Sequence, residues 1–179
     1  MEEPDPNVIR AAAAGDQDAF TTLVRAAQPH VWRFLRHVLD DEELAADVTQ
    51  ETFIRVHRAL GGFRHQARFS TWLFRIARNA ALDEQRRGAR RQKLDAAIAR
   101  PRSASDASLG TEVRAALASL SPLLREAFVL VEVFGQPYKE AAEVLGVPIG
   151  TVKSRVFRAR LELVNWFNEG EASGSGHSG

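Results

Sequence analysis

Apolar residues recur along most of this chain at intervals of three and four, the spacing of one face of an α-helix. The clearest run keeps a strict four-residue step: Leu44, Val48, Thr52, Val56 and Leu60. No stretch alternates apolar and polar residues over the length of a strand. The Val-rich segment 128–134 is short, and helical patterns flank it on both sides. The sequence therefore predicts an all-α fold.

The first half of the pattern divides into four helical segments. We expect them at residues 7–28, 30–39, 42–60 and 71–87. A Gly-Asp pair breaks the first segment internally, and Pro29 marks the boundary with the second. Residues 61–70 then form a loop, which ends at Ser70, a favourable N-cap for the fourth segment.

Residues 88–111 differ from the segments on either side. They hold Arg-Arg pairs, Pro101 and a serine-rich run, with few apolar residues, which indicates a flexible linker. Residues 112–168 return to a helical pattern, and the Gly- and Ser-rich residues 169–179 are expected to be disordered. The predicted architecture is two small helical domains, 1–87 and 112–168, joined by a flexible tether.

Charge is unevenly distributed, although the net charge of the 179 residues is only +1. Residues 1–52 carry 4 basic and 11 acidic side chains, whereas residues 53–102 carry 13 basic and 3 acidic side chains. Of the 24 cations, 21 are Arg, whose planar guanidinium suits phosphate groups. This basic block favours contact with nucleic acid. A solvated helix face is the alternative interpretation.

Several classes of protein are disfavoured by the composition. The chain has no Cys, which excludes disulfide scaffolds, zinc–cysteine sites and thiol nucleophiles. No run of 18 apolar residues is present, so we expect no membrane insertion. The five His residues show no ligand spacing with carboxylates, and no glycine-rich phosphate loop occurs. We therefore expect no enzymatic activity, no bound metal and no cofactor.

The C-terminal unit shows the pattern of a helix-turn-helix. Pro137 opens a short helix that ends at Leu145, and Gly146 can adopt the left-handed backbone of a tight turn. The last helix is expected from about Thr151 to Phe167 and is strongly cationic. Its first turns would meet base edges if it binds DNA. An ordinary helical hairpin with a solvated cationic face is the alternative.

Three segments together resemble bacterial sigma factors of the extracytoplasmic-function group. Residues 47–60 are similar to the helix that binds core RNA polymerase, and residues 69–87 to the helix that recognises the promoter −10 element. Residues 145–160 are similar to the helix-turn-helix that reads the −35 element. The resemblance implies a cytoplasmic factor that directs core polymerase to promoters, helps to open the −10 element and responds to a stress or another signal. It also implies an anti-sigma factor as a partner.

The resemblance assigns roles to residues in the N-terminal domain. The polymerase-binding residues are Asp47, Gln50 and Glu51. Opening DNA removes bases from the stack at a cost of a few kcal/mol each, and a protein pocket can offset that cost. The expected −10 residues lie in the loop and the following helix: Phe63, Arg64, Gln66, Arg68, Phe69, Arg75, Arg78 and Asn79, with Arg86 and Arg87 along the DNA backbone. The alternative for Phe63 and Phe69 is a place in the hydrophobic core.

The resemblance also assigns roles to residues in the last helix. Lys153, Ser154, Phe157 and Arg158 are expected to face the major groove or its walls. Arg155 and Arg160 are expected to contact phosphates or to pair within the domain. Val152 and Val156 are expected to be buried.

Two other readings of the sequence stay open. The chain could be a polymerase-independent helix-turn-helix regulator with a sensing or dimerising N-terminal domain, or a helical adaptor that binds only protein. Specific DNA interfaces bury about 1,000–2,500 Å² of protein surface, and one small module falls at or below that range. The sequence has no long heptad repeat that would indicate a dimer. Two tethered modules then bind tightly only if a scaffold sets their spacing. We therefore expect the free chain to bind promoter DNA weakly and to gain specificity on polymerase.

Overall fold

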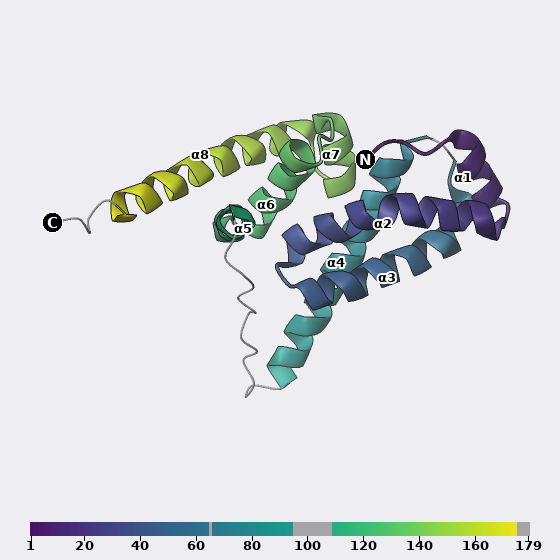
Figure 1. The fold of residues 1–179 in the computed structure, drawn as a ribbon, viewed down its shortest axis with the longest axis horizontal. Helices are drawn as coiled ribbons and strands as arrows, with labels where there is room; N and C mark the ends of the chain where they lie inside the picture. The colour runs from purple at the N-terminus through teal and green to yellow at the C-terminus, as the bar shows by residue number, and fades with distance from the viewer. Residues whose placement is uncertain (65, 95–108, 175–179) are drawn as a thin grey trace. The chain divides into compact units, whose positions relative to one another are not determined.

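The computed structural model describes residues 1–64, 66–94 and 109–174, and every regular element within them is a helix (Figure 1). The chain divides into two compact units, with the division between Ser103 and Ala104. The predictions of an all-α fold and of two helical domains are thus confirmed. Within the described part, no helix is both long and apolar enough to cross a membrane.

The N-terminal unit contains four α-helices. They are α1 (Pro6–Ala13), α2 (Gln17–Leu39), α3 (Glu42–Ala59) and α4 (Phe69–Leu94), with the 3-10 turn η1 (Leu60–Gly62) after α3. Helices α2 and α3 lie side by side, and α4 contacts both of them (Figure 1). Helix α1 packs on α2 and on η1.

The core of this unit lies where α2, α3 and α4 meet. The rings of Phe34 and Phe74 contact each other edge to face, with centroids 5.2 Å apart. From α3, Val48, Thr52 and Val56 are at most 4% exposed, so the four-residue step of the sequence is the buried seam of this helix. The Thr52 hydroxyl donates a hydrogen bond to the Val48 carbonyl at 2.7 Å, which satisfies the one polar group of the seam.

The expected helix boundary at Pro29 is wrong, because α2 continues through this residue to Leu39. Proline inside a helix removes a backbone hydrogen bond and costs about 3 kcal/mol. Pro29 is exposed, and the helix on either side of it contributes Ala27 and Val31 to the core, at 1% and 0% exposure. Burial of this continuous apolar face offsets the local cost.

Three expected helix ends are also wrong. Helix α4 continues past residue 87 to Leu94, and α5 begins at Leu109 rather than after residue 111. Helix α8 continues past residue 168 to Gly174. Residues 88–94 are rich in Arg, Gln and Lys, which have good helix propensity without being apolar. The rest of the expected linker and tail, 95–108 and 175–179, lies outside the described residues.

The C-terminal unit contains α5 (Leu109–Ser119), α6 (Pro122–Phe128), the π-helical turn η2 (Val129–Val133), α7 (Tyr138–Leu145) and α8 (Ile149–Gly174). The Val-rich segment is therefore helical, as expected. Helix α8 packs against α5, α6 and α7. Its Val152 and Val156 are 0% and 1% exposed, which confirms their predicted burial.

The turn between α7 and α8 depends on Gly146, whose φ is 65° and ψ 36°. Most residues with a Cβ are strained in this left-handed region, and a β-branched side chain is strained most. We expect Gly146→Val to lower the free energy of unfolding of the C-terminal unit by about 1–3 kcal/mol.

Gly150 provides the matched control for this prediction. It lies in α8 without a positive φ, and a Cβ there would meet open space. Gly150→Ala should leave stability unchanged or raise it slightly. Hydrogen exchange of the α7 and α8 amides in the full chain measures both variants. Equal protection in Gly146→Val and the parent protein would contradict the assignment of the turn.

Candidate nucleic-acid and protein interfaces

In its first three turns, α8 has one exposed face that carries its cations and an opposite face that is buried. The structure places all four residues expected at the major groove on the exposed face: Lys153, Ser154, Phe157 and Arg158. Phe157 is 61% exposed, although it lies one residue from the buried Val156. The Ser154 hydroxyl bonds back to the Thr151 carbonyl at 2.9 Å, so this side chain stays close to the helix. The helix can therefore present its cations to DNA without disturbing its core.

The two other cations expected to act in α8, Arg155 and Arg160, have different surroundings. Arg160 Nη2 lies 2.6 Å from Glu132 Oε1. This hydrogen bond, with the charge of Glu132, raises the pKa of Arg160. Of the two roles expected for Arg160, the structure thus contains the pair within the domain. Arg155 is half-buried, and its Nη1 atom is fully enclosed without a hydrogen-bond partner.

The three residues expected to bind polymerase are three and four positions apart, so they share one side of α3, where they border two different hollows. Asp47 and Glu51 lie one turn apart and line the same cavity of about 310 Å³ beside α4, together with Arg87. Asp47 and Gln50 are exposed and Glu51 is half-buried. Gln50 lines a separate groove between α2 and α3. The expected face is therefore wider than a single acidic stripe.

The groove beside Gln50 is mostly apolar and has a volume of about 620 Å³. Phe20 of α2 and Phe53, Ile54 and His57 of α3 line it. Ile54 is 46% exposed, so the groove has apolar surface that the unit itself does not cover. Phe53 is half-buried and lines this groove, which was not predicted from the sequence. The spacing gave a signal for it, since Phe53 and Ile54 stand outside the four-residue step of the buried seam.

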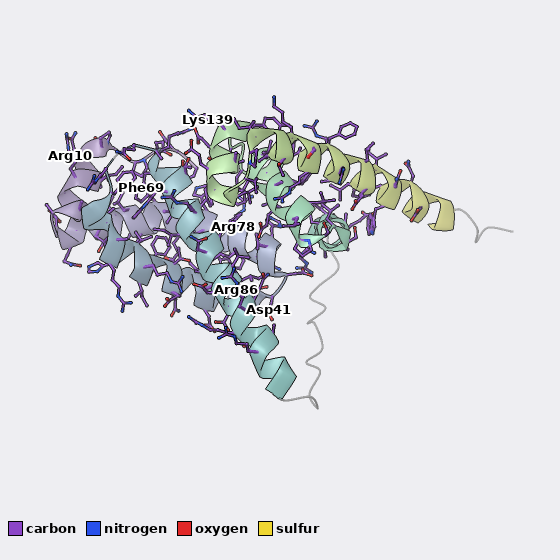
Figure 2. All side chains as sticks on the ribbon, turned by 180° about the vertical axis from the view of Figure 1, so that it is seen from behind. Arg10, Asp41, Phe69, Arg78, Arg86 and Lys139 are labelled. Carbon is purple, nitrogen blue, oxygen red and sulfur yellow. The ribbon has the colours of Figure 1, made fainter. Side chains whose placement is uncertain are left out.

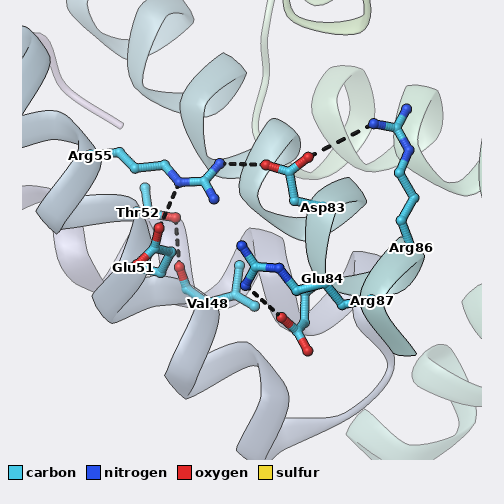
Figure 3. A network of polar contacts seen from close by, with 8 residues as sticks. All are labelled: Val48, Glu51, Thr52, Arg55, Asp83, Glu84, Arg86 and Arg87. Atoms are coloured by element: carbon cyan, nitrogen blue, oxygen red, sulfur yellow. Dashed lines mark hydrogen bonds and ion pairs between the residues drawn. The ribbon is translucent and has the colours of Figure 1, made fainter. Parts of the chain in front are cut away.

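A polar network joins the expected polymerase face of α3 to α4 (Figure 3). Arg55 Nε lies 2.8 Å from Glu51 Oε1, and Arg55 Nη1 lies 2.7 Å from Asp83 Oδ2. The hydrogen bonds that Arg55 donates to Glu51 and Asp83 raise the pKa of Arg55. Arg86 approaches Asp83 at 3.8 Å, so this cation, expected along the DNA backbone, also contacts its own domain. The network fixes the relative position of the two helices.

We expect Arg55→Ala to lower the free energy of unfolding of the N-terminal unit by about 1–3 kcal/mol. The reason is that two partly buried carboxylates would each lose a charge-assisted hydrogen bond. Arg25→Ala is the control, because Arg25 is exposed on α2. Urea unfolding of the full chain measures the free energy of unfolding of both variants. Hydrogen exchange assigns the transition to the N-terminal unit. Equal stabilities of the two variants would show that the network is not structural.

The loop before α4 carries the aromatic residues expected to hold a base. Phe63 is half-buried, and its ring centroid lies 5.0 Å from that of Trp72. Phe69 was expected to offer a stacking face, but it is 2% exposed, and its ring contacts those of Phe63 and Trp72, with centroids 5.9 Å and 5.8 Å away. The enclosed ring leaves no face for a base, and its place is in the core beneath the loop. Of the two phenylalanines, Phe63 is the one with exposed surface.

The polar residues expected at the −10 element lie around this loop and along α4. Arg64, Gln66 and Arg68 are exposed in the loop, and Arg75 and Asn79 are exposed on α4. Arg78 is half-buried. Figure 2 shows Phe69 near the start of α4, with Arg78 and Arg86 farther along the same helix. Residues 75, 78 and 79 are three or four positions apart, so they share one side of the helix.

The expected N-cap at Ser70 is wrong, because α4 begins one residue earlier, at Phe69. Ser70 is 0% exposed and lies within the first turn. The backbone N–H groups of Phe69 and Ser70 instead donate to the carboxylate of Glu3, at 3.0 Å and 3.1 Å. No local pattern could have indicated Glu3, because 66 residues separate it from Phe69.

Comparison with known proteins places both units in one family. The family model Sigma-70 region 2 matches residues 23–91, and the model Sigma-70 region 4 matches residues 111–163. The Mycobacterium tuberculosis protein named ECF RNA polymerase sigma factor SigC is 38% identical over 162 residues, which cover 86% of this chain and 85% of that protein. The ECF RNA polymerase sigma-E factor of Salmonella typhimurium is 34% identical over 178 residues, covering 90% and 93%.

Solved structures agree with the sequence comparison. The sigma factor RpoE of Bartonella quintana, solved with the anti-sigma factor NepR, superimposes with a TM-score of 0.75 at 28% identity. The superposition covers 83% of this chain and 96% of that protein. With both conserved regions in order and relatives of similar length, the chain belongs to the extracytoplasmic-function group of RNA polymerase sigma factors.

Proposed function

We propose that this protein directs core RNA polymerase to promoters that carry a −10 and a −35 element. The observation that supports this most strongly is the exposed face of α8. Its four groove residues are all open to solvent, while Val152, Val156 and Ala159 on the other side are at most 1% exposed. A cationic helix anchored in this way can enter the major groove without any rearrangement of its own unit.

In this proposal α3 is the surface that binds polymerase. Asp47 supplies an exposed charge, which sets the register and the rate of association. The groove beside Gln50 supplies apolar surface through Ile54, which the domain itself leaves exposed. Burial of apolar surface supplies affinity, at about 25 cal/mol per Å². A partner helix with basic and apolar side chains would match both features.

The loop 61–68 and α4 act on the −10 element. Phe63 offers partly exposed aromatic surface for an unstacked base, and base–aromatic stacking contributes about 1–3 kcal/mol. Gln66 offers a hydrogen-bonding amide, and Arg64 and Arg68 offer charge to phosphates. Arg75 and Asn79 extend this surface along α4. Capture of a base here offsets part of the cost of opening the duplex.

The polymerase-independent alternatives fit less well. Relatives of nearly the same length are named sigma factors, which favours action with polymerase in the cytoplasm over an independent regulator. The affinity of a protein-only adaptor for its partner would depend weakly on salt concentration. The affinity of a DNA complex falls as the salt concentration rises, and falls more steeply the more phosphates the protein contacts. A similar solved sigma factor is bound to an anti-sigma factor. We propose that this chain is also held inactive by a protein of that kind.

Run-off transcription with purified core polymerase on a randomised promoter library tests the proposal. The expected result is transcripts that require this protein and that share two sequence elements at a fixed spacing. A library with no such transcripts, above the level given by core polymerase without the protein, would contradict it. The recovered promoters also supply the templates for the experiments below.

A further inference from the structure

Among the four α-helices described in the N-terminal unit, α4 alone begins without an acidic residue directly before it. At α1, α2 and α3 the residue before the helix is Asp5, Asp16 or Asp41, and its carboxylate accepts from a backbone N–H of the first turn at 2.7–2.9 Å. Arg68 stands in the corresponding position of α4, where its carbonyl accepts the first helical bond, from Trp72 N at 3.1 Å. An Arg side chain has no acceptor, so it cannot cap a helix N-terminus.

Glu3, which is distant in sequence but adjacent in space, supplies the missing cap. Its Oε2 accepts from Phe69 N at 3.0 Å, and its Oε1 accepts from Ser70 N at 3.1 Å. Arg68 Nε lies 3.5 Å from the same Oε1. One carboxylate thus joins the last residue of the loop to the first turn of α4. Phe69 and Ser70 are 2% and 0% exposed, so both N–H groups depend on a protein partner.

The position of Glu3 is itself fixed by the fold. Asp5 caps α1 two residues later, and Ile9 of α1 is 3% exposed in the core. The N-terminal residues and the loop face each other across a cavity of about 610 Å³, whose lining includes Glu3, Phe63 and Arg68. The segment before α1 therefore lies against the loop that contains the expected base-binding residues.

We propose that Glu3 is a positioning residue for opening of the −10 element, acting through Arg68 and the first turn of α4. This inference rests on the proposed function of the loop. A pocket that is ordered before DNA arrives loses less conformational entropy when it captures a base. Glu3 provides that order, because it fixes the point where the loop ends and holds Arg68 beside it. Without Glu3, the loop must become ordered at the moment of base capture.

The test compares Glu3→Ala and Glu3→Gln with the control Glu2→Gln in the full chain with core polymerase. Glu2 is exposed and next in sequence, so its variant removes the same charge. Affinity tags belong at the C-terminus, so that the N-terminal segment is unaltered. Open complexes are measured on a promoter recovered from the library, both as intact duplex and with its −10 segment already unpaired.

We expect Glu3→Ala to slow opening of the duplex about 10-fold or more, since it removes two hydrogen bonds to a charged acceptor. The already unpaired template should restore activity to within about two-fold of the parent, because the step that needs an ordered loop is bypassed. Glu3→Gln retains one acceptor oxygen, so its rate of duplex opening should lie between those of Glu3→Ala and the parent. Glu2→Gln should match the parent. Exchange of the Phe69 and Ser70 amides should accelerate in Glu3→Ala without DNA.

Three results would overturn the inference. Unchanged opening would show that the cap does not serve the loop. An equal loss on both templates would make Glu3 a purely structural residue. Faster opening would mean that its carboxylate competes with DNA phosphate for Arg68. Phe63→Ala separates this inference from the proposed function: if it slows opening and Glu3→Ala does not, only the role of Glu3 fails. If neither variant slows opening, the assignment of the loop fails as well.

Discussion

Asp47→Lys should reduce the affinity of this protein for core RNA polymerase about 100-fold or more. Asp47 is exposed on α3, and like charges brought together at an interface cost several kcal/mol. An exposed site also tolerates the change, so stability should stay within about 0.5 kcal/mol of the parent. Competition between the variant and the labelled parent for a limiting amount of core polymerase measures the loss.

Glu43→Lys is the control for this result. It makes the same charge reversal at another exposed position of α3, one turn before Asp47. Glu51→Lys is a less specific variant, since it would also repel Arg55 within the polar network. Equal binding by Asp47→Lys and Glu43→Lys would show that charge on α3 acts without regard to position, and the assigned face would be wrong.

Arg158→Ala should relax sequence selectivity in the −35 element, by about 10- to 100-fold at one or two base positions. Arg158 is exposed on the groove face of α8, and a bidentate Arg–guanine pair discriminates by about 1–3 kcal/mol. Selection of promoters by the holoenzyme, followed by sequencing, measures preference at each position.

The matched variant is Arg160→Ala, because Arg160 is committed to Glu132. It should leave the selected sequence unchanged, even if binding weakens uniformly. An unchanged selection with Arg158→Ala as well would mean that Arg158 contacts only phosphates. The sequence would then be read by other residues of this face.

Patterns local in the chain predicted most of the fold. Val48, Thr52 and Val56 of α3 are buried, as are Val152 and Val156 of α8, because a helix places residues three and four apart on one side. The left-handed turn at Gly146 was also predictable, since few other residues adopt that backbone. Helix lengths were harder to predict. Residues 88–94 are mostly polar, yet their intrinsic helix propensity continues α4.

Features that depend on distant contacts could not be read from the sequence. Helix α2 continues through Pro29 because burial of the core residues on both sides of it outweighs the cost of the lost backbone hydrogen bond. The cap of α4 requires Glu3 to lie beside residues far away in the chain. The exposure of Ile54 and the burial of Phe69 likewise depend on which neighbouring helix covers each side chain. For the candidate site, the sequence thus indicated segments, but not which of their side chains are open to solvent.

We propose that neither unit selects a promoter by itself, and that binding to polymerase is what joins their two readouts. The most direct test measures affinity for a recovered promoter and for a scrambled duplex, with the free chain and with the holoenzyme at the same salt concentration. We expect the free chain to prefer the promoter by less than about 10-fold, and the holoenzyme to prefer it by about 1,000-fold or more. Tight, promoter-specific binding by the free chain would contradict it.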